Sequence, residues 1–424
     1  RVAAPGLRVG RRGRRRRVVV VGAGFAGAAA LRELARSGDR LEAVLVDQNN
    51  FHLFTPLLYQ AAVGEVDPEH TVYPARALVE HNPSLRFWYA RVEDVDLQGR
   101  RVLTSRGALR YDYLLLAPGS ATNFFGMEEV ERHTLPLKTV KDAIGIRNHL
   151  LRRFDQASLE SDPERRRELL RFVVVGAGAT GVELASALQD FIHLVLLKEY
   201  PAVDPDEVRI LVLEARDTIL PGWDPRVAQR TLALLQRKGI EVRLEAPVTA
   251  AWEEGVRLRD GTTIPAGTVV WTAGVRPAPL VERLAVAKAQ DGRLLVDPYL
   301  RVVGHPQVYA AGDCAYVAHD GRPLAGTAAV AEQEGRAAAR NILRQARCQA
   351  PRPFRYRYAG DTVILGRWTA VAHLPRPDVV FDGLPAWWLW RGFHWAKLPG
   401  LRNRLAVLVD WLFAGSRRST VELR

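Results

Sequence analysis

The chain has 424 residues, 48% of them hydrophobic and 25% charged, so it can bury the cores of two or three soluble domains. Its two cysteines are too few for a disulfide framework or a four-cysteine zinc or iron–sulfur site, and they suit a reducing compartment. The formal net charge is +13, but residues 1–17 carry eight arginines and no acid. We expect this arm to be a disordered, solvated tail. It is not expected to bind nucleic acid, because no stacking aromatic residues interleave with its arginines.

No apolar stretch of the signal-peptide kind follows the basic arm, so a secretory signal is not expected. No segment holds about 18 uninterrupted apolar residues, so the sequence predicts no transmembrane helix. An enzyme with a lipid-soluble substrate would then have to lie on the bilayer surface. The basic arm could add about 1 kcal/mol of attraction to anionic lipid for each basic residue near the surface.

The first strong motif is RVVVVGAGFAG at Arg17–Gly27, a β-branched run followed by three glycines. A helix is predicted over Ala28–Arg36, and a second apolar strand, Val44–Asp47, ends in an acid. The first glycine permits a tight turn, the second lets a pyrophosphate approach the backbone, and the third lets the helix pack on the strand. The helix N-terminus then presents free N–H groups and a positive dipole to the phosphates. The predicted dinucleotide-binding residues are Gly22, Gly24, Phe25, Ala26, Gly27 and Asp47.

A second copy of the motif, RFVVVGAGATG, occupies Arg171–Gly181. It is followed by a predicted helix, Val182–Phe191, and by a strand that ends in an acid, Ile210–Glu214. Glu214 lies 33 residues after Gly181, whereas Asp47 lies 20 after Gly27, and we assign the excess to a loop or short helical insertion at His193–Val208. Two complete copies of strand, glycine loop, helix and acid are far more specific than one glycine triplet. The residues predicted to bind the second dinucleotide are Gly176, Gly178, Gly181 and Glu214.

Two further strands indicate how the two nucleotide domains are connected. Tyr111–Ser120 is an apolar strand that ends in a Pro-Gly turn, and Val308–Ala315 is another that ends in Gly312-Asp313. Such returning segments suit one dinucleotide domain inserted into another. Within the inserted domain, Val269–Pro277 is predicted to be a late strand and turn. The fold class is therefore α/β, with two Rossmann-like domains.

After Pro351 the pattern changes. Phe354–Arg367 alternates like strands, and five of the ten tryptophans lie within residues 387–411. Apolar residues recur at helical spacing over Leu401–Phe413, with charged residues on the other faces. This pattern fits a helix docked on the core or on a second subunit, and it fits equally an amphipathic helix at a membrane surface.

These residues resemble the type II NADH:quinone oxidoreductases, which are single-subunit respiratory dehydrogenases that do not pump protons. The resemblance covers Val18–Leu423. Its more discriminating parts are HLFTPLLYQA at His52–Ala61 and GLRNRLAVLVDW at Gly400–Trp411. Related disulfide reductases carry a cysteine pair after the first nucleotide strand, and sulfide:quinone oxidoreductases also need catalytic cysteines. Here Asp47–Gln60 has none. Cys314 and Cys348 are both expected to be buried small hydrophobes.

The resemblance implies the cofactors and their ligands. FAD would lie on the first glycine loop with Asp47 on its ribose, and NADH on the second loop with Glu214 on its ribose, which favours NADH over NADPH. Asp313, after Gly312, would accept from a ribityl hydroxyl. Ala273 and Gly274 would flank the nicotinamide. Backbone near the flavin would come from Leu57, Leu58, Ala117, Pro118 and Gly119.

The resemblance also implies the chemistry: hydride passes from NADH to the flavin, and electrons and protons then pass to menaquinone or ubiquinone. Glu183, expected in the first turn of the second helix, would lie near the reacting rings and deliver a proton. The family usually has a glutamine where this chain has Ala329. Glu332 and Gln333, with Lys397 in the tryptophan-rich segment, are therefore the candidate quinone ligands. No metal is expected.

The predicted domains are a basic tail at 1–17, an FAD domain at 18–137 and 297–350, an NADH domain at 138–296, and a membrane-anchoring and dimerisation region at 351–424. The predicted location is the cytoplasmic face of the cell membrane, with a homodimer possible. Two alternatives remain: a soluble NADH:ferredoxin or rubredoxin reductase, and a non-catalytic protein that holds FAD structurally and senses NADH.

Overall fold

A computed structural model describes residues 15–319, 321–414 and 421–423. Most of the predicted basic tail lies outside these residues. Its predicted end was wrong, because strand β1 (Arg16–Val21) already includes the last two arginines. Arg17 pairs with Glu42 of strand β2 (Leu41–Asp47) at 3.2 Å, so at this position the arginine is a strand residue with a carboxylate partner.

The chain forms two compact units, which are described separately. Unit 1 comprises Arg1–His52, Pro74–Ser120 and Pro277–Tyr356, and unit 2 comprises Leu53–Tyr73, Ala121–Arg276 and Arg357–Arg424. The boundaries of these two units differ from the boundaries predicted for the FAD and NADH domains. The FAD and NADH domain boundaries remain predictions.

Unit 1 is built on a five-stranded, wholly parallel sheet in the order β21-β9-β1-β2-β5. The strand that leads into the first glycine loop lies at the centre, and Val18–Val21 are 0–3% exposed, as expected for a strand buried on both faces. This order is that of a Rossmann-like sheet. The other strands of the sheet are β5 (Leu85–Tyr89), β9 (Tyr113–Leu116) and β21 (Val308–Ala310).

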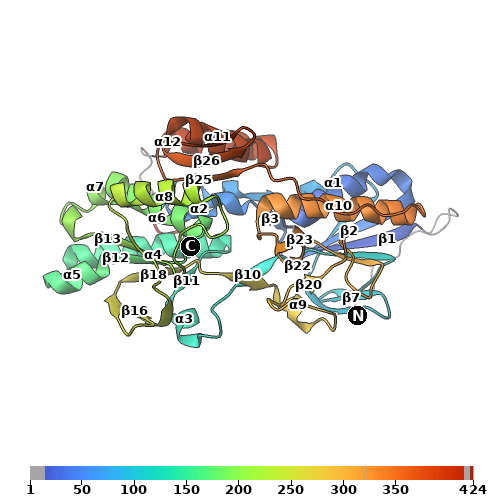
Figure 1. Cartoon of the computed structure of the whole chain (residues 1–424), viewed down its shortest axis with the longest axis horizontal. Helices are drawn as coiled ribbons and strands as arrows, with labels where there is room; N and C mark the ends of the chain where they lie inside the picture. Colours follow the sequence, from blue (N-terminus) through green and yellow to red (C-terminus); the bar gives the residue numbers. More distant parts are fainter. Residues whose placement is uncertain (1–14, 320, 415–420, 424) are drawn as a thin grey trace. The chain divides into compact units, whose positions relative to one another are not determined.

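Helices α1 (Phe25–Leu34) and α10 (Ala328–Ala346) of unit 1 pack closely against each other (Figure 1). A Cβ atom on Gly335 would lie 2.1 Å from the backbone oxygen of Ala26, so only glycine permits this approach. Gly312 is close by, since its Cβ would be 3.4 Å from the side chains of Ala26 and Ala331. The packing of these two helices therefore fixes the place of the Gly312-Asp313 turn beside the first glycine loop.

Unit 2 repeats the same design. Its parallel sheet has the order β11-β18-β12-β13-β14, with the strand before the second glycine loop again at the centre. The two Rossmann-like sheets predicted from the repeated motif are thus confirmed. The strands are β11 (Leu135–Pro136), β12 (Arg171–Val175), β13 (Arg209–Leu213), β14 (Glu241–Arg243) and β18 (Thr268–Trp271).

Helix α6 (Ala179–Phe191) runs on without a break into a π-helical turn, Ile192–Leu196, and helix α7 (Leu197–Glu199). The long spacing to Glu214 therefore begins as an extension of the helix, and a loop forms only after it. Among the described residues this one helix, Ala179–Glu199, is long and apolar enough to cross a membrane. However, 61% of its most apolar window is buried in the structure, as in a core helix.

The C-terminal part of unit 2 is a three-stranded antiparallel sheet followed by helices α11 (Leu384–Lys397) and α12 (Leu401–Phe413), drawn in red in Figure 1. The predicted helix over Leu401–Phe413 is confirmed. The strand prediction was wrong for residues 354–360, which have no regular structure. The strands are β25 (Asp361–Ile364), β26 (Ala370–Pro375) and β27 (Asp378–Asp382).

Shorter strands and further helices complete the two units. The remaining strands are β3 (Phe51–Leu53), β4 (Val72–Pro74), β6 (Val92–Asp96), β7 (Arg101–Thr104), β8 (Gly107–Arg110), β10 (Ser120–Thr122), β15 (Val248–Trp252), β16 (Gly255–Leu258), β17 (Thr263–Pro265), β19 (Val275–Pro277), β20 (Leu294–Leu295), β22 (Ala315–Tyr316), β23 (Ala318–His319) and β24 (Arg322–Pro323). The remaining α-helices are α2 (Leu58–Ala62), α3 (Glu128–His133), α4 (Val140–Leu159), α5 (Pro163–Leu169), α8 (Pro225–Arg237) and α9 (Pro279–Arg283).

The contact between α1 and α10 gives a first prediction. Gly335→Ala should destabilise the protein by about 1–3 kcal/mol, because the added methyl group overlaps a backbone oxygen and the helices must separate. Gly145→Ala, in helix α4, is the matched control, since its Cβ would meet no atom within 4 Å. Thermal unfolding measures both. A Gly335→Ala variant as stable as the control would show that the helices do not depend on this close approach.

Candidate functional site

The first glycine loop has the geometry of a phosphate cradle. Gly22 has φ +102°, and a Cβ there would lie 2.1 Å from the backbone oxygen of Ala117. A Cβ on Gly27 would lie 1.9 Å from the oxygen of Gly22, whereas one on Gly24 would meet nothing within 4 Å. No side chain caps α1 and its first turn holds no acid, so its N–H groups are available to an anion. These residues fit a dinucleotide such as FAD.

Asp47 stands at the end of β2 beside this loop. Its Oδ2 accepts a hydrogen bond from the backbone N–H of Ala23 at 2.7 Å, and Oδ1 accepts one from Asn49 at 2.7 Å. Burial raises the pKa of this carboxyl above its ordinary value. The Asp47 carboxylate therefore holds the glycine loop in position through these hydrogen bonds. Asp47 is also the residue predicted to bind a ribose.

The Gly312-Asp313 turn is held by two side chains of unit 1. The Ser120 hydroxyl donates to Oδ2 of Asp313 at 2.5 Å, and Glu334 accepts the backbone N–H of Gly312 at 2.6 Å. The sequence reading missed Glu334, which is 2% exposed and whose pKa is raised to about 8 by burial. No pattern in the sequence marks this acid, because only the packed structure shows that its side chain on α10 faces inward.

The other residues predicted near the flavin fall into two groups. Ala117, Pro118 and Gly119 directly follow β9, and Gly119 has φ +73° in the predicted turn. Leu57 and Leu58 belong to unit 2, where both are buried. Their roles toward FAD remain predictions.

The second glycine loop has the same backbone geometry at its three glycines as the first loop. Gly176 has φ +100°, and a Cβ on Gly181 would lie 1.9 Å from the Gly176 oxygen. A Cβ on Gly178 would meet nothing within 4 Å, and α6 likewise has no side-chain cap and no acid in its first turn. Glu214 accepts the backbone N–H of Ala177 at 2.7 Å, as Asp47 does from Ala23. This loop therefore fits a second dinucleotide equally well.

Ala273 and Gly274 lie close beside this loop. A Cβ on Gly176 would approach the backbone N and Cα of Ala273 to 2.8 Å. The Thr272 hydroxyl donates to the backbone oxygen of Val175 at 2.8 Å, which ties the end of β18 to the loop. The structure thus brings the two residues predicted to flank the nicotinamide to the second dinucleotide loop.

Glu183 differs from its prediction in one respect. The helix begins at Ala179, so Glu183 lies past the first turn and does not face the helix N-terminus. Its carboxylate oxygen Oε1 instead accepts from the backbone N–H of Ile364 at 3.3 Å and from Nε1 of Trp390 at 3.2 Å. Burial outweighs these two donors and raises the pKa of Glu183 to about 8. At neutral pH it is therefore a protonated carboxylic acid.

A series of hydrogen-bonded side chains lies near this acid. Tyr59 packs edge-on to Trp390, with ring centroids 6.4 Å apart, and its hydroxyl accepts from Nε2 of Gln60 at 2.9 Å. The Gln60 oxygen in turn accepts from Nε1 of Trp411 at 2.9 Å. Burial, reinforced by Glu183 and Glu65, raises the pKa of Tyr59 well above its ordinary value. Glu183 and Tyr59 are therefore both in their neutral, protonated forms. Helices α11 and α12 supply the aromatic side chains of Trp390 and Trp411 to this site.

The three predicted quinone residues lie in different units. Glu332 and Gln333 are on α10 in unit 1, and Lys397 is on α11 in unit 2. Glu332 is ion-paired with Arg336 and lies 3.7 Å from Arg32. The Lys397 ammonium lies 5.7 Å from the Phe393 ring. None of these contacts assigns a quinone ligand, so the three roles remain predictions.

The cysteines and histidines add one correction and one side-chain cluster that the sequence did not predict. Cys314 is buried as predicted, and burial raises its pKa, but Cys348 is exposed, so that half of the prediction was wrong. The structure also brings His373 close to Asp224 and Asp378, a group that could hold a metal. Arg226 already pairs with both carboxylates, at 2.7 and 2.5 Å, so the cluster has a cation of its own.

Comparison with known proteins agrees with this geometry. The family model described as pyridine nucleotide-disulphide oxidoreductase matches residues 16–335. The chain is 33% identical to the type II NADH:quinone oxidoreductase Ndh of Mycobacterium tuberculosis, over 97% of this chain and 90% of the relative. It is 29% identical to an Arabidopsis thaliana mitochondrial internal alternative NAD(P)H-ubiquinone oxidoreductase, over 96% and 85% of the two chains. The structure of NDH2 from Plasmodium falciparum in complex with NADH has the same fold, with a TM-score of 0.88 at 18% identity, covering 97% of this chain and all of that one.

Two dinucleotide loops on paired Rossmann-like sheets and the family match define the class: the chain is a pyridine nucleotide-disulphide oxidoreductase in fold. Within that class it belongs to the type II NADH:quinone oxidoreductases, which are FAD-dependent enzymes. The resemblance noted from the sequence is thereby confirmed, and the family supports a quinone acceptor over the soluble ferredoxin-reductase alternative.

Proposed function

We propose that this chain oxidises NADH and reduces a membrane quinone, and that Glu183 delivers a proton to the reduced quinone. The observation that carries the proposal is a half-buried glutamate, Glu183, on the helix that begins at the second dinucleotide loop, whose carboxyl pKa is raised to about 8 by desolvation. FAD, when bound, supplies the two-electron transfer between the nicotinamide and the quinone. Quinone reduction also consumes two protons, and a buried acid with a pKa near the working pH suits their transfer.

The chain's own residues have distinct tasks in this proposal. The two glycine loops bind the pyrophosphates, and Asp47 and Glu214 bind the adenosine riboses while bracing those loops. A carboxylate at Glu214 would repel a 2′-phosphate, which favours NADH. Trp390 orients the Glu183 carboxyl through its indole N–H. The tryptophan-rich helices exclude water from this acid and so keep its proton in place.

The Glu183 role predicts a split between the two half-reactions. Under anaerobic conditions NADH should bleach the flavin absorbance of the wild type and of Glu183→Gln at similar rates, whereas a quinone analogue should restore it far more slowly in the variant. In the wild type the quinone step should slow about tenfold per pH unit above pH 8, as the acid ionises, and the variant should show no such break.

The exposed Glu164→Gln on α5 is the matched control and should behave like the wild type. Equal loss of both half-reactions in Glu183→Gln would contradict a proton-delivery role. Flavin that NADH cannot bleach would support the non-catalytic alternative, and bleaching that no quinone reverses would support the soluble reductase.

We further propose that α12 lies on a membrane surface. The acid of this helix is buried, together with Val407, whereas five of its apolar residues are exposed. Asp410 is 1% exposed and accepts from the backbone N–H of Asp67 at 3.1 Å and contacts Nδ1 of His70 at 2.5 Å. Leu412 is 78% exposed. The exposed apolar residues of α12 are Leu401, Leu405, Val409, Leu412 and Phe413.

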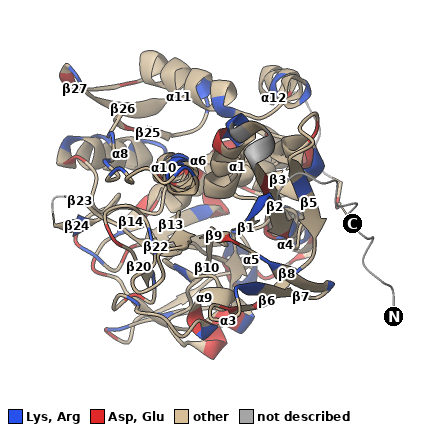
Figure 2. Cartoon of the chain, turned by 90° about the vertical axis from the view of Figure 1, so that its right-hand side faces the viewer, with Lys and Arg blue, Asp and Glu red and all other residues tan. Residues whose placement is uncertain are grey.

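The charge of these helices supports a lipid surface. Figure 2 shows blue but almost no red along α11 and α12, since Asp410 is their one acid while Arg391, Lys397, Arg402 and Arg404 are basic. Exposed apolar and aromatic side chains flanked by basic ones suit the headgroup boundary. We place this surface on the cytoplasmic face, where NADH is available. Sealed right-side-out vesicles should then not oxidise added NADH, and inverted ones should.

The membrane proposal is tested by charging the exposed stripe. Leu405→Glu combined with Leu412→Glu should weaken liposome binding in flotation assays by about a hundredfold or more, because each leucine lost from an apolar environment costs about 1.5–3 kcal/mol. Leu159→Glu with Val303→Glu is the control, since both side chains are exposed and lie on other elements. If the stripe variant loses a homodimer and keeps its liposome binding, the stripe is a subunit interface and the membrane proposal is wrong.

A further inference from the structure

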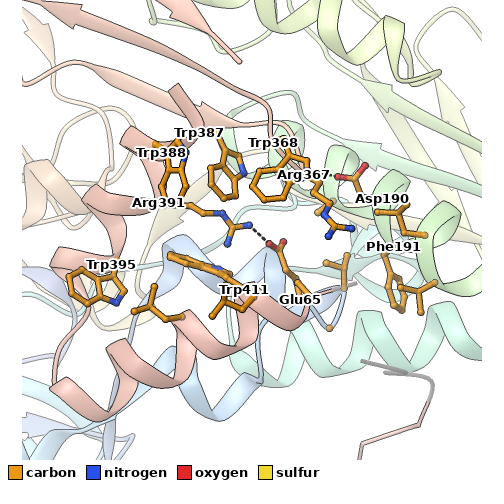
Figure 3. A pocket seen from close by; sticks show the side chains of 18 of the residues that line it. Glu65, Asp190, Phe191, Arg367, Trp368, Trp387, Trp388, Arg391, Trp395 and Trp411 are labelled. Carbon is orange, nitrogen blue, oxygen red and sulfur yellow. Dashed lines mark hydrogen bonds and ion pairs between the residues drawn. The ribbon is translucent and has the colours of Figure 1, made fainter. Parts of the chain in front are cut away.

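Unit 2 contains a cavity of about 440 Å³ that none of the tasks above uses (Figure 3). Its walls come from the end of α6, the π-helical turn, the loop at Val63–Glu65, and helices α11 and α12. This volume is in the range of small-molecule sites. The lining is mostly apolar and aromatic, and Trp368, Trp388 and Leu412 at the cavity are 49%, 64% and 78% exposed. An apolar chain could therefore enter from the surface that carries the exposed stripe of α12.

One wall of the cavity contains a buried cation with unused donors. Arg391 is 6% exposed and points between Trp387 and Trp411, with its guanidinium 4.4 Å from each ring centroid (Figure 3). Its Nη2 donates to Glu65 at 2.6 Å, but Nε and Nη1 have no hydrogen-bond partner among the described residues, and neither has Nε1 of Trp387. Buried donors left unpaired cost about 1–3 kcal/mol each, more when charged. An acceptor group bound here would remove part of that cost.

The charges around the cavity favour an anion. Asp190 is neutralised by Lys238 at 2.7 Å, and Glu65 by Arg391. Arg367 is exposed at the cavity, its guanidinium lies 5.8 Å from the Trp368 ring, and it makes no ion pair with a described residue. The lining holds two acids and two arginines, but Asp190 is paired with Lys238 from outside the lining, so Arg367 has no acid partner among the described residues and Arg391 keeps unused donors.

We propose that this cavity binds one anionic phospholipid of the membrane. An acyl chain would lie against the tryptophans and the apolar residues of α6, and the phosphate would accept from the guanidinium groups of Arg367 and Arg391. Arginine suits this role because its planar fork matches phosphate geometry. A neutral quinone would also fill an apolar cavity, but it would leave Arg367 without an anionic partner.

Gly392 makes the cavity testable without removing a charge. It lies in the middle of α11 and lines the cavity, and a Cβ there would meet no atom within 4 Å. Glycine costs about 1 kcal/mol relative to alanine inside a helix, so its presence here is explained if a side chain would obstruct a ligand. Gly392→Phe should block the cavity. Gly145→Phe in α4 is the matched control, because its Cβ also meets nothing within 4 Å.

The test is native mass spectrometry of the full chain released from detergent micelles that contain phosphatidylglycerol or phosphatidylcholine. We expect the wild type and Gly145→Phe to retain one phosphatidylglycerol and to bind it at least tenfold more tightly than phosphatidylcholine. Gly392→Phe should weaken this binding at least tenfold. Arg367→Gln and Arg391→Gln should reduce phosphatidylglycerol affinity to that of phosphatidylcholine.

Equal affinity of the wild type for the two lipids, or unchanged phosphatidylglycerol binding by Gly392→Phe, would overturn the proposal. Displacement of the lipid, one for one, by menaquinone would also overturn it, since the cavity would then be a quinone site. Binding is measured without NADH or turnover, so its failure is distinct from a failure of the proposed reaction.

Discussion

The arrangement of unit 2 depends on one constraint, the burial of the Glu183 carboxyl. Its carboxylate accepts hydrogen bonds only from the indole of Trp390 and the backbone N–H of Ile364. These two bonds lower the pKa less than desolvation raises it, so the group keeps its proton near neutral pH. The donors come from the C-terminal sheet and α11, whereas the acid lies on the helix that begins at the second dinucleotide loop. The helix of the second dinucleotide loop and the C-terminal helices thus meet at a titratable group, the one to which we assign the proton transfer.

The C-terminal helices therefore have two roles on opposite faces. Their inner face supplies Trp390 beside the acid and buries Asp410 beside His70, while their outer face exposes the apolar stripe. Because the same helices build the interior of unit 2, deleting them would disturb the acid as well as any membrane contact. Single substitutions on the outer face separate the two roles.

The sequence predicted the parts of the fold that repeat a local rule. Each glycine loop carries its own turn, helix start and strand-end acid, so both sheets and both braces, Asp47 and Glu214, could be predicted from spacing alone. The surroundings of Glu183 could not be predicted, because its hydrogen-bond partners Ile364 and Trp390 lie 181 and 207 positions away along the chain. The sequence also placed this acid in the first turn of its helix, but the helix begins earlier, at Ala179. Glu334 and Arg391 were missed for the same reason: only tertiary packing shows that a charged residue on a helix faces inward.

The most direct test of this account is the protonation state of Glu183 itself. Infrared spectra of the resting enzyme, recorded as a function of pH and subtracted from those of Glu183→Gln, isolate the carbonyl band of this one carboxylic acid. We predict a protonated-carboxyl band at pH 7 that disappears with a midpoint near pH 8. A band that disappears near pH 4.5, the ordinary value for glutamate, would contradict it, because the acid would then be ionised at neutral pH and could not deliver a proton.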